Sequence, residues 1–484
     1  MRRPEGRLVD DVVLTGARPR AASARADVGT TEDWVVVEAD DPRTLAAYRE
    51  LRRETFVREQ GLFSVSDRDE VDEDDRTRVL VARRPDGSVL GGVRLHPASE
   101  GGPRDIGWWR GSRLAVVPDA RAGRGLGAAL VRAACALAES LGALRFDATV
   151  QARHEPLFRR LGWDVRGPVA LRGHPHVVMS WPIARVHRLV EATKAPLGAL
   201  LAETLAQPGG GGGAGFVGDD GAPVPGSDLV AACDAILPSM VERDPEWAGW
   251  CAVLVNLNDL FAMGAAPVGL LDAVGARDAS FARRVLRGVT DAARAWDVPV
   301  LGGHTQLGVP GSLSVTALGR AARPVPGGGG SAGHRLRVTA DLGGSWRAGH
   351  SGAQWDSSTV RAPHQLRSLA GVVPGLDPTA AKDVSMSGLV GTTGMLAEAS
   401  GCGAVLDVAA VPRPDGASSG DWLTCFPGFV VVTAERTPPA YDVPGFLTTA
   451  TCGELVPGTG VGLRWPDGVV TEAVAGTVTG MGAA

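Results

Sequence analysis

The sequence predicts a protein of the α/β and α+β class with two folded regions, the second of which is built from two halves. Short apolar runs rich in Val alternate with longer segments of helical periodicity, which is the pattern of strands packed against helices. The chain has 484 residues, about three times the ~150 residues of an ordinary domain. A glycine cluster at 324–334 divides the second region. We therefore expect a poorly ordered leader at 1–32, a first domain at 33–185 with a mixed central sheet flanked by helices, and two halves at 186–325 and 326–484.

Composition excludes several classes of protein. Lys and Arg number 49 against 54 Asp and Glu, a net charge of −5, whereas a general nucleic-acid binder is usually basic. No apolar run reaches the roughly 18–20 residues of a membrane span, and the N-terminus lacks the apolar segment of a secretory signal. The six cysteines form no CxxC pair and indicate reduced thiols. We expect a cytoplasmic protein without nucleic-acid or membrane partners.

The first region alternates strands and helices from residue 34 to residue 183. An acidic run, DRDEVDEDD at 67–75, follows the first helix, and a Pro-Asp-Gly turn at 85–87 joins the next two strands. We expect strands at 34–39, 79–83, 89–95, 112–117, 145–150 and 177–183, and helices at 44–59, 126–141 and 155–161.

The second region begins with a helical pattern at 185–207, in which leucines such as Leu200 and Leu201 form an apolar face. A glycine-rich stretch at 208–215 follows. Its composition alone predicts a flexible linker, but the two aspartates behind it favour a loop inside a domain. Beyond it we expect a strand at 229–237 and a helix at 282–296, and then the second half.

A glycine turn precedes the long helix of the first region. Gly123, Gly125 and Gly127 follow a β-branched strand directly. Closely spaced glycines let backbone N–H groups approach a ligand, and a helix N-terminus adds partial positive charge, which suits a pyrophosphate. A glycine at this position is, on its own, more often only a tight turn.

The turn and its flanking strands resemble the acyl-CoA-binding motif R/Q-x-x-G-x-G/A of the GNAT family of N-acyltransferases. The matching residues are 122–127, so Ala122 takes the basic position and Arg121 or Arg124 must supply the charge. RRETFVREQGL with the acidic run, and LFRRLGW, resemble further motifs of the family. The resemblance covers residues 34–183 and implies acetyl-CoA or another acyl-CoA, a small-molecule amine as acceptor, and cofactor-binding roles for Val116, Arg121, Gly123, Arg124, Gly125 and Gly127.

The catalytic groups of this region are less clearly indicated. Arg159 stands where many family members have a tyrosine, the general acid for the leaving thiolate. Either another group protonates the thiolate, or it leaves without a dedicated acid, or catalysis is lost. Glu54 and Glu59 on the first helix, and the acidic residues 72–75, are candidates for the base that deprotonates the amine. The alternative for each is a solvated helix face or loop.

Acidic and amide side chains stand at several expected loop ends of the second region. Magnesium nucleotides bind through carboxylate and water oxygens, and phosphoryl transfer needs such groups together with a backbone cradle for phosphate. The glycine-rich stretch can serve as that cradle. Each acid taken singly is more often a cap or turn residue. The side chains are Asp219 and Asp220 after Gly218, Asp234 at a strand end, and Asn256, Asn258 and Asp259 in VNLNDLFAMGAAP.

In order and spacing these residues resemble the AIR synthase (PurM) superfamily of ATP-dependent enzymes. NLNDLFAMGAAP matches its N-x-x-D-x-x-A-M-G-x-x-P segment, and AAKDVSMSGL resembles its D-x-S-D-G-L segment. The resemblance spans residues 186–480 and implies a two-half fold and a homodimer formed through strands of the first half. It also implies Mg²⁺ bound by Asp219, Asp220, Asp234 and Asp259, with ATP near Gly218 and Asn256.

Two positions depart from the superfamily pattern. His304 replaces the acid of G-G-D-T, and Met386 replaces the second Asp of D-x-S-D-G. Because Mg²⁺ binds imidazole poorly, we expect His304 to contact phosphate or substrate, or to signal fewer metal ions. Lys382, one of only two lysines, and Asp383 are candidates for phosphate or substrate contact, with a surface ion pair as the alternative.

The two regions resemble an acyltransferase and an AIR synthase-related protein that accompany each other, usually as separate chains, in nitrilase-containing bacterial gene clusters. The interpretation is a bifunctional enzyme of nitrogen metabolism. Its first domain acylates an amine, and its second uses ATP to activate an amide-type oxygen for cyclisation or dehydration, or acts as a kinase. A nitrilase is a candidate pathway partner. The alternative is an active N-acetyltransferase with a nucleotide-binding or scaffold domain that does not turn over, which His304 and Met386 favour.

Overall fold

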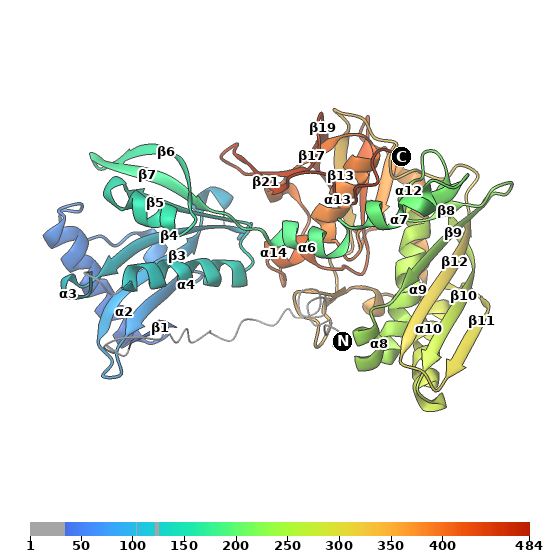
Figure 1. The fold of residues 1–484 in the computed structure, drawn as a ribbon, viewed down its shortest axis with the longest axis horizontal. Helices are drawn as coiled ribbons and strands as arrows, with labels where there is room; N and C mark the ends of the chain where they lie inside the picture. The colour runs from blue at the N-terminus through green and yellow to red at the C-terminus, as the bar shows by residue number, and fades with distance from the viewer. Residues whose placement is uncertain (1–33, 103, 122–124) are drawn as a thin grey trace, which may run out of the picture. The chain divides into compact units, whose positions relative to one another are not determined.

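The computed structural model describes residues 34–102, 104–121 and 125–484. The expected leader at 1–32, and Gly123 and Arg124 of the glycine turn, lie outside the described residues. The chain divides into two compact units, one formed mainly by the described residues up to Arg185 and the other mainly by those from Val186 onward. Both units mix helices with sheets, which confirms the predicted fold class (Figure 1).

A seven-stranded sheet forms the centre of the N-terminal unit. Its order is β1-β2-β3-β4-β5-β7-β6, and β4 and β5 are the pair that runs parallel. The strands are β1 Val35–Glu38, β2 Arg78–Arg83, β3 Val89–Pro97, β4 Trp108–Val116, β5 Arg145–Gln151, β6 Asp164–Leu171 and β7 His174–Trp181.

Helices cover both faces of this sheet. A Cβ atom at Gly91 would lie 2.8 Å from Leu126, whereas one at the adjacent Gly92 would lie 2.6 Å from Tyr48. Because neighbouring residues of a strand face opposite sides, the helices that carry Leu126 and Tyr48 lie on opposite faces. The predicted helix at 44–59 is present, but its last seven residues are π-helical. The helices are α2 Pro42–Arg52, the π-helix Arg53–Glu59, α3 Pro118–Arg121, α4 Leu126–Ser140 and α5 Glu155–Arg160.

A bulge divides β4 into two parts. Its pairing with β5 covers Trp108 to Gly111. Arg113 has a φ of 55°, and the ladder to β3 is irregular between Gly92 and Arg94. A bulge of this kind bends a strand. The part of β4 that ends at Val116 therefore diverges from β5, and its backbone groups on that side are not used in the ladder.

The first half of the C-terminal unit is a five-stranded sheet of order β11-β10-β12-β9-β8. Helix α9 packs on β9 and β12, and α10 packs on α9. The predicted helix at 282–296 is confirmed as part of α10. The elements are α6 Arg185–Thr193, α7 Leu197–Leu205, β8 Ala222–Pro223, β9 Leu229–Ala235, α8 Pro238–Arg243, α9 Pro245–Ala262, β10 Ala266–Ala276, α10 Ala279–Trp296, β11 Val300–Leu307 and β12 Ser312–Arg320.

The helical pattern at 185–207 is interrupted in the structure. Pro196, which has no backbone N–H to donate, lies between α6 and α7. Leu200 is 74% exposed and Leu201 is 37% exposed. The expectation of one apolar face along the whole segment is therefore wrong, because the break separates α6, which buries Val186 and Val190, from α7, which has no buried residue.

The second half contains a seven-stranded sheet of order β16-β18-β13-β19-β17-β20-β21. The two halves share one hydrophobic core, in which side chains of α9 pack with Leu366, Ala381 and Val431. The elements are β13 Arg335–Ala340, β14 Ser345–Trp346, β15 Trp355–Asp356, α11 Pro363–Ser368, α12 Val372–Leu376, β16 Ala380–Asp383, α13 Gly388–Ala399, β17 Gly403–Asp407, α14 Ser419–Thr424, β18 Val430–Glu435, β19 Thr448–Val456, β20 Val461–Arg464 and β21 Val470–Val474.

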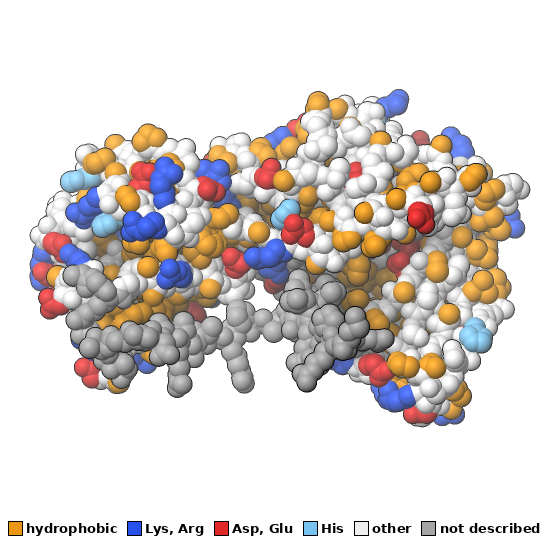
Figure 2. All heavy atoms as spheres, in the orientation of Figure 1, with side chains coloured by type: hydrophobic (Ala, Val, Ile, Leu, Met, Phe, Trp, Pro, Cys, Tyr) orange, Lys and Arg blue, Asp and Glu red, His pale blue; other side chains and the backbone are white. Residues whose placement is uncertain are grey.

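Strand β11 forms an open edge of the five-stranded sheet, and each of its residues is exposed. Leu271 of β10 and Val300, Leu301 and Leu307 of β11 are 40–58% exposed. Hydrophobic side chains are visible on the surface in the region of this sheet in Figure 2. Among the helices of the described residues, none has the length and apolar character needed to cross a membrane.

Candidate active sites

Helix α4 begins at the described end of the predicted glycine turn. Gly125 caps this helix with a φ of 63°, in the left-handed region that suits glycine. A Cβ atom at Gly125 or Gly127 would meet nothing within 4 Å. The first N–H groups of a helix have no intrahelical partner. Among the described residues, the start of α4 therefore has room for a ligand beside Gly125 and Gly127.

Arg121 and Glu59, predicted to bind the cofactor and to act as the base, are brought together by the fold. The Arg121 guanidinium donates to both carboxylate oxygens of Glu59, at 2.5 and 2.7 Å, and its Nε donates to the carbonyl of Val116 at 2.8 Å. The hydrogen bond from Arg121 lowers the pKa of Glu59. A paired carboxylate with a lowered pKa is a weaker base than a free one.

The other predicted bases are paired as well. Glu54 accepts from Arg58 at 2.6 Å on an exposed helix face. Asp72 accepts from the buried Arg52 at 2.5 Å and lies 3.0 Å from Arg94. Burial alone would raise the pKa of Asp72, but the hydrogen bond and charge of Arg52 hold that pKa well below its ordinary value. These contacts give the acidic run a structural role, since it neutralises arginines that are out of reach of water.

Tyr48 links this charged cluster to the bulge in β4, and no local sequence pattern indicates this link. Its hydroxyl donates to the carbonyl of Arg113 at 2.7 Å, 65 positions away in the chain. The side chain is fully buried, and burial raises the pKa of the phenol. With its proton committed to the bulge, Tyr48 does not replace the acid missing at Arg159.

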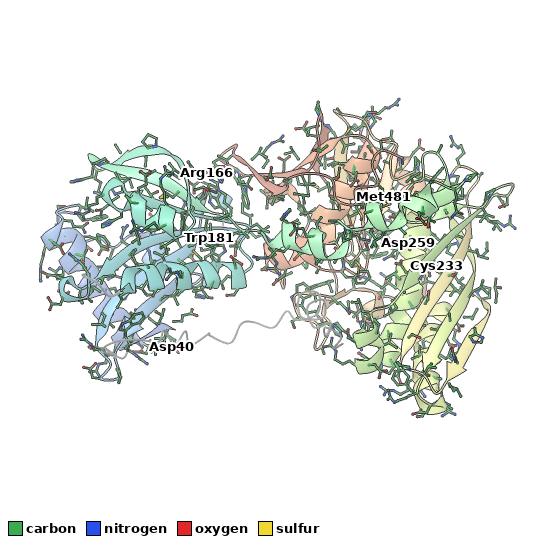
Figure 3. All side chains as sticks on the ribbon, viewed as in Figure 1. Asp40, Arg166, Trp181, Cys233, Asp259 and Met481 are labelled. Carbon is green, nitrogen blue, oxygen red and sulfur yellow. The ribbon has the colours of Figure 1, made fainter. Side chains whose placement is uncertain are left out.

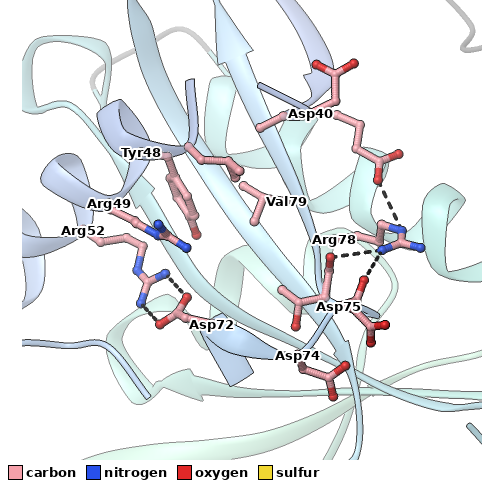
Figure 4. A pocket seen from close by; sticks show the side chains of 13 residues that line it. Asp40, Tyr48, Arg49, Arg52, Asp72, Asp74, Asp75, Arg78 and Val79 are labelled. Carbon is pink, nitrogen blue, oxygen red and sulfur yellow. Dashed lines mark hydrogen bonds and ion pairs between the residues drawn. The ribbon is translucent and has the colours of Figure 1, made fainter. Parts of the chain in front are cut away.

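A pocket of about 310 Å³ opens beside this cluster (Figure 4). Figure 4 shows Tyr48 and Arg52 in its wall, with Asp72 and Asp75 from the acidic run. Its other charged lining residues are Glu38, Asp40, Arg49, Asp74 and Arg78. The acids outnumber the arginines, which favours a cationic ligand over an anionic one.

Three carboxylates meet in the C-terminal unit. Oxygens of Asp220, Asp259 and Asp383 lie within 4.8 Å of one another. They come from the loop before β8, the last turn of α9 and the end of β16, and Figure 3 marks Asp259. Burial, together with the neighbouring carboxylates, raises the pKa values of Asp259 and Asp383 well above the ordinary value. One oxygen of Asp383, Oδ2, is buried without a hydrogen-bond partner.

Lys382 contacts Asp220 of this carboxylate group and is 1% exposed. Its Nζ donates to the carbonyl of Gly218 at 3.2 Å, to Asp219 at 3.1 Å and to Asp220 at 2.9 Å. Burial by itself lowers the pKa of an amine, but the two carboxylates raise the pKa of Lys382 above its ordinary value. The alternative given for Lys382, a surface ion pair with Asp383, is wrong: the lysine is buried and pairs with Asp219 and Asp220. Its predicted contact with phosphate or substrate stays a prediction.

Asp234 and Asn256, the other residues predicted from the resemblance, form a neighbouring contact. The Asn256 side-chain oxygen accepts from the backbone N–H of Asp234 at 3.1 Å, and its amide donates to the carbonyl of Ala252 at 2.8 Å. Asn256 is fully buried. In the structure it positions the end of β9, where burial raises the pKa of Asp234.

His304 lies apart from the carboxylates. It is exposed on the edge strand β11, and β10 and β12 separate that strand from β9, which carries Asp234. Strands are ~4.8 Å apart, so three steps span roughly 14 Å. Within one chain, His304 therefore lies far from the carboxylate group Asp220, Asp259 and Asp383. Its predicted catalytic role stays a prediction. Met386 is 37% exposed and follows Asp383 closely in the chain.

The chain matches three families of known proteins. Residues 45–163 match the acetyltransferase (GNAT) family, residues 218–321 the N-terminal domain of AIR synthase related protein, and residues 328–435 its C-terminal domain. An uncharacterized protein of Synechocystis, sll0787, is 35% identical over 227 residues, which are 46% of this chain and 70% of that protein.

The chain is also similar to thiamine-monophosphate kinases. The one from Rhodopirellula baltica is 32% identical over 219 residues, which are 42% of this chain and 66% of that protein. A solved structure of the enzyme from Aquifex aeolicus is 20% identical, with a TM-score of 0.42, and the match covers 57% of this chain and 97% of that one. The chain belongs to the AIR synthase-related family and carries a GNAT-family domain in front of it, as its motifs predicted.

Proposed function

We propose that this protein is a bifunctional enzyme. Its N-terminal domain transfers an acyl group from acyl-CoA to the nitrogen of a small amine, and its C-terminal domain uses Mg-ATP to activate an amide-type oxygen on a small metabolite. The observation that carries the proposal is the group Asp220, Asp259 and Asp383, because three buried carboxylates without a full set of donors are suited to the magnesium ion of a nucleotide.

The acyltransferase half of the proposal is supported by the opening between β4 and the start of α4. The N–H groups of the first turn of α4, which have no intrahelical partner, would hold the pyrophosphate of acyl-CoA. Arg121, which is paired with Glu59, would add positive charge once that pair opens. Bound acyl-CoA supplies the activated acyl group. The chain itself orients that group along β4, whose backbone is free of β5 beyond Gly111.

The donor set of the C-terminal unit fits a magnesium ion. It consists of oxygen atoms alone, and the unpartnered Oδ2 of Asp383 has the strong acceptor character that such an ion requires. Bound magnesium would neutralise phosphate charge at this position. The relatives named thiamine-monophosphate kinases support phosphoryl transfer as the chemistry of the domain.

The exposed edge β11 supports a homodimer as the working form. An open, apolar strand edge is normally covered by another chain or blunted by charge, and β11 carries Leu301 and Leu307 exposed to solvent. A nitrilase is the proposed pathway partner.

A second candidate function is an active N-acetyltransferase with a nucleotide-binding or scaffold domain. The position of His304, which stands outside the carboxylate group, favours it. In that case Asp383 and its neighbours bind a magnesium nucleotide but do not promote its cleavage.

Incubation of the full chain with acetyl-CoA, a panel of small amines and Mg-ATP separates the two candidates. The proposal expects release of free CoA with the right amine, and release of ADP that depends on the acylated product. Asp383→Asn should abolish ADP release and leave CoA release within twofold of the original rate. CoA release with no ADP would support the second candidate, and release of neither product from any amine would contradict both.

A further inference from the structure

Lys382 has no free donor left for a ligand. An ammonium group has three N–H donors, and three oxygens, those of Gly218, Asp219 and Asp220, lie 2.9–3.2 Å from its Nζ. The backbone also confines the side chain, because a Cβ atom at Gly327 would lie 2.8 Å from the Lys382 Cε. The amine is therefore a fixed charge within the fold.

Asp219 is satisfied by the protein as well. Its Oδ1 accepts from Lys382 and from the N–H of Asp220 at 2.8 Å, and its Oδ2 accepts from the N–H of Gly327 at 2.6 Å. Asp220 accepts from Lys382 through Oδ1 and from the N–H of Asp383 through Oδ2 at 2.9 Å. Lys382 contacts both adjacent carboxylates, and its single positive charge balances one of their two negative charges.

Among the described residues, no cation forms an ion pair with Asp259 or Asp383, and the charge of Lys382 acts on Asp383 without a direct contact. They lie beside Asp220, both are at most 5% exposed, and Oδ2 of Asp383 has no hydrogen-bond partner. Buried carboxylates without a counter-charge are costly and are normally paired or bound to a metal. The positive charge that this part of the group lacks matches a single divalent ion.

We propose that Lys382 takes the place of one metal ion, so that this chain binds a single divalent cation, on Asp220, Asp259 and Asp383. This inference rests on the proposed function only in that the C-terminal unit is taken to be a magnesium-nucleotide site. It assigns Lys382 a positioning role through Asp219 and Asp220, and none in contacting substrate.

The inference is tested by counting bound Mn²⁺ on the full chain by electron paramagnetic resonance, without nucleotide or acyl-CoA. We expect one tightly bound Mn²⁺ per chain, with an affinity that falls about tenfold or more in Asp383→Asn. Lys382→Met, which keeps the length of the side chain and removes its charge, should bind two. Lys194→Met removes the other lysine of the chain and should still bind one.

Because Lys382→Met leaves two buried carboxylates without their partner, the double variant Lys382→Met/Asp219→Asn, which removes one charge of each sign, is examined in parallel and should bind one ion. Two ions that depend on Asp383 in the unaltered chain would overturn the inference, as would a single ion in folded Lys382→Met. If Lys382→Met does not fold, the count in the unaltered chain decides. The Mn²⁺ count is made without substrate and therefore does not depend on ATP turnover. A chain that binds one Mn²⁺ but does not turn over ATP would contradict the proposed function and leave this inference standing.

Discussion

At the scale of single residues, ion pairing separates the acidic side chains that are free to react from those that hold the fold together. Asp72 neutralises buried arginines, and Glu59 holds Arg121 with two hydrogen bonds. Two of the candidate bases are thus already engaged in the structure. Glu59 lies beside the expected pyrophosphate position, where a negative charge opposes binding of an anion.

Substitution of Glu59 distinguishes a base from a residue that restrains Arg121. We expect Glu59→Gln to lower the KM for acyl-CoA about threefold, because Arg121 is released, and to leave kcat within about twofold. Loss of a general base would instead reduce kcat by a factor of about 10²–10⁴. Steady-state kinetics measures both constants. Glu50→Gln, at an exposed position of α2 that has no predicted role, is the matched control and should change neither constant.

His96 in β3 makes the stability of the N-terminal unit depend on pH. Burial lowers the pKa of His96 from 6.5 to about 4, and its Nδ1 lies 2.9 Å from the carbonyl of Pro97. Between these two values the unfolded chain binds more protons than the folded one, so stability falls as the pH falls. Thermal unfolding between pH 7 and pH 4 should show this loss. His96→Asn, whose amide can keep the donor, should flatten the profile over that window, and an unchanged profile would contradict the assignment.

At the scale of elements, the bulge in β4 and the glycine start of α4 together form the position at which we propose that acyl-CoA binds. Arg113 is held in an unusual backbone conformation by the hydroxyl of Tyr48 beneath it. The bend separates β4 from β5, and the first turn of α4 faces the open side with glycines. Both elements are needed for this position, because β4 supplies a strand edge that is not paired with β5, and α4 supplies the N–H groups of its first turn.

The space in front of α4 can be tested with one methyl group. A Cβ at Gly127 would meet nothing in the protein within 4 Å, so Gly127→Ala should not lower the thermal unfolding midpoint, since alanine favours a helix over glycine by about 1 kcal/mol. The methyl group would stand where the ligand approaches, and we expect the KM for acyl-CoA to rise about tenfold. Gly167→Ala in β6 also meets nothing within 4 Å and should leave the KM unchanged. Equal KM values for the two variants would place the cofactor elsewhere.

At the scale of the whole molecule, the C-terminal site exists because two halves share one core. Lys382 and Asp219 are 163 positions apart in the chain and meet as an ion pair. Burial of α9 between the halves brings Asp259 to the same place. A small change in how the two halves pack would therefore change the distances between the side chains of the site.

The exposed edge of the first half leads to a prediction about assembly. Leu301 on β11 is 58% exposed, and a charge placed in an apolar strand edge prevents pairing with another chain. Leu301→Glu should convert a dimer into a monomer in sedimentation equilibrium. Leu200→Glu, at a leucine of α7 that is 74% exposed, should leave the dimer intact. A monomer in the unaltered chain would contradict the proposed assembly.

The sequence predicted the elements and motifs well where the signal is local. The helix at 282–296 and the alternation of strands with helices follow from hydrophobic periodicity, which neighbouring residues determine. The apolar face expected along 185–207 failed because Pro196 breaks the segment and leaves Leu200 in solvent. The pairing of Glu59 with Arg121 could not be predicted, since 62 positions separate them and only the fold of the intervening strands brings them together.

The sequence by itself determined the class of both regions and the presence of a glycine turn before α4. It predicted Asp220 and Asp259 as metal ligands, but it assigned Asp383, which meets them in the structure, to phosphate or substrate. The tertiary structure alone decided which of those acids remain available. Asp219 is satisfied by Lys382 and Gly327, whereas Asp383 keeps a buried oxygen without a partner. The physical reason is that motif residues report the type of chemical group, while its charge and its reactivity depend on the donors that distant parts of the chain place around it.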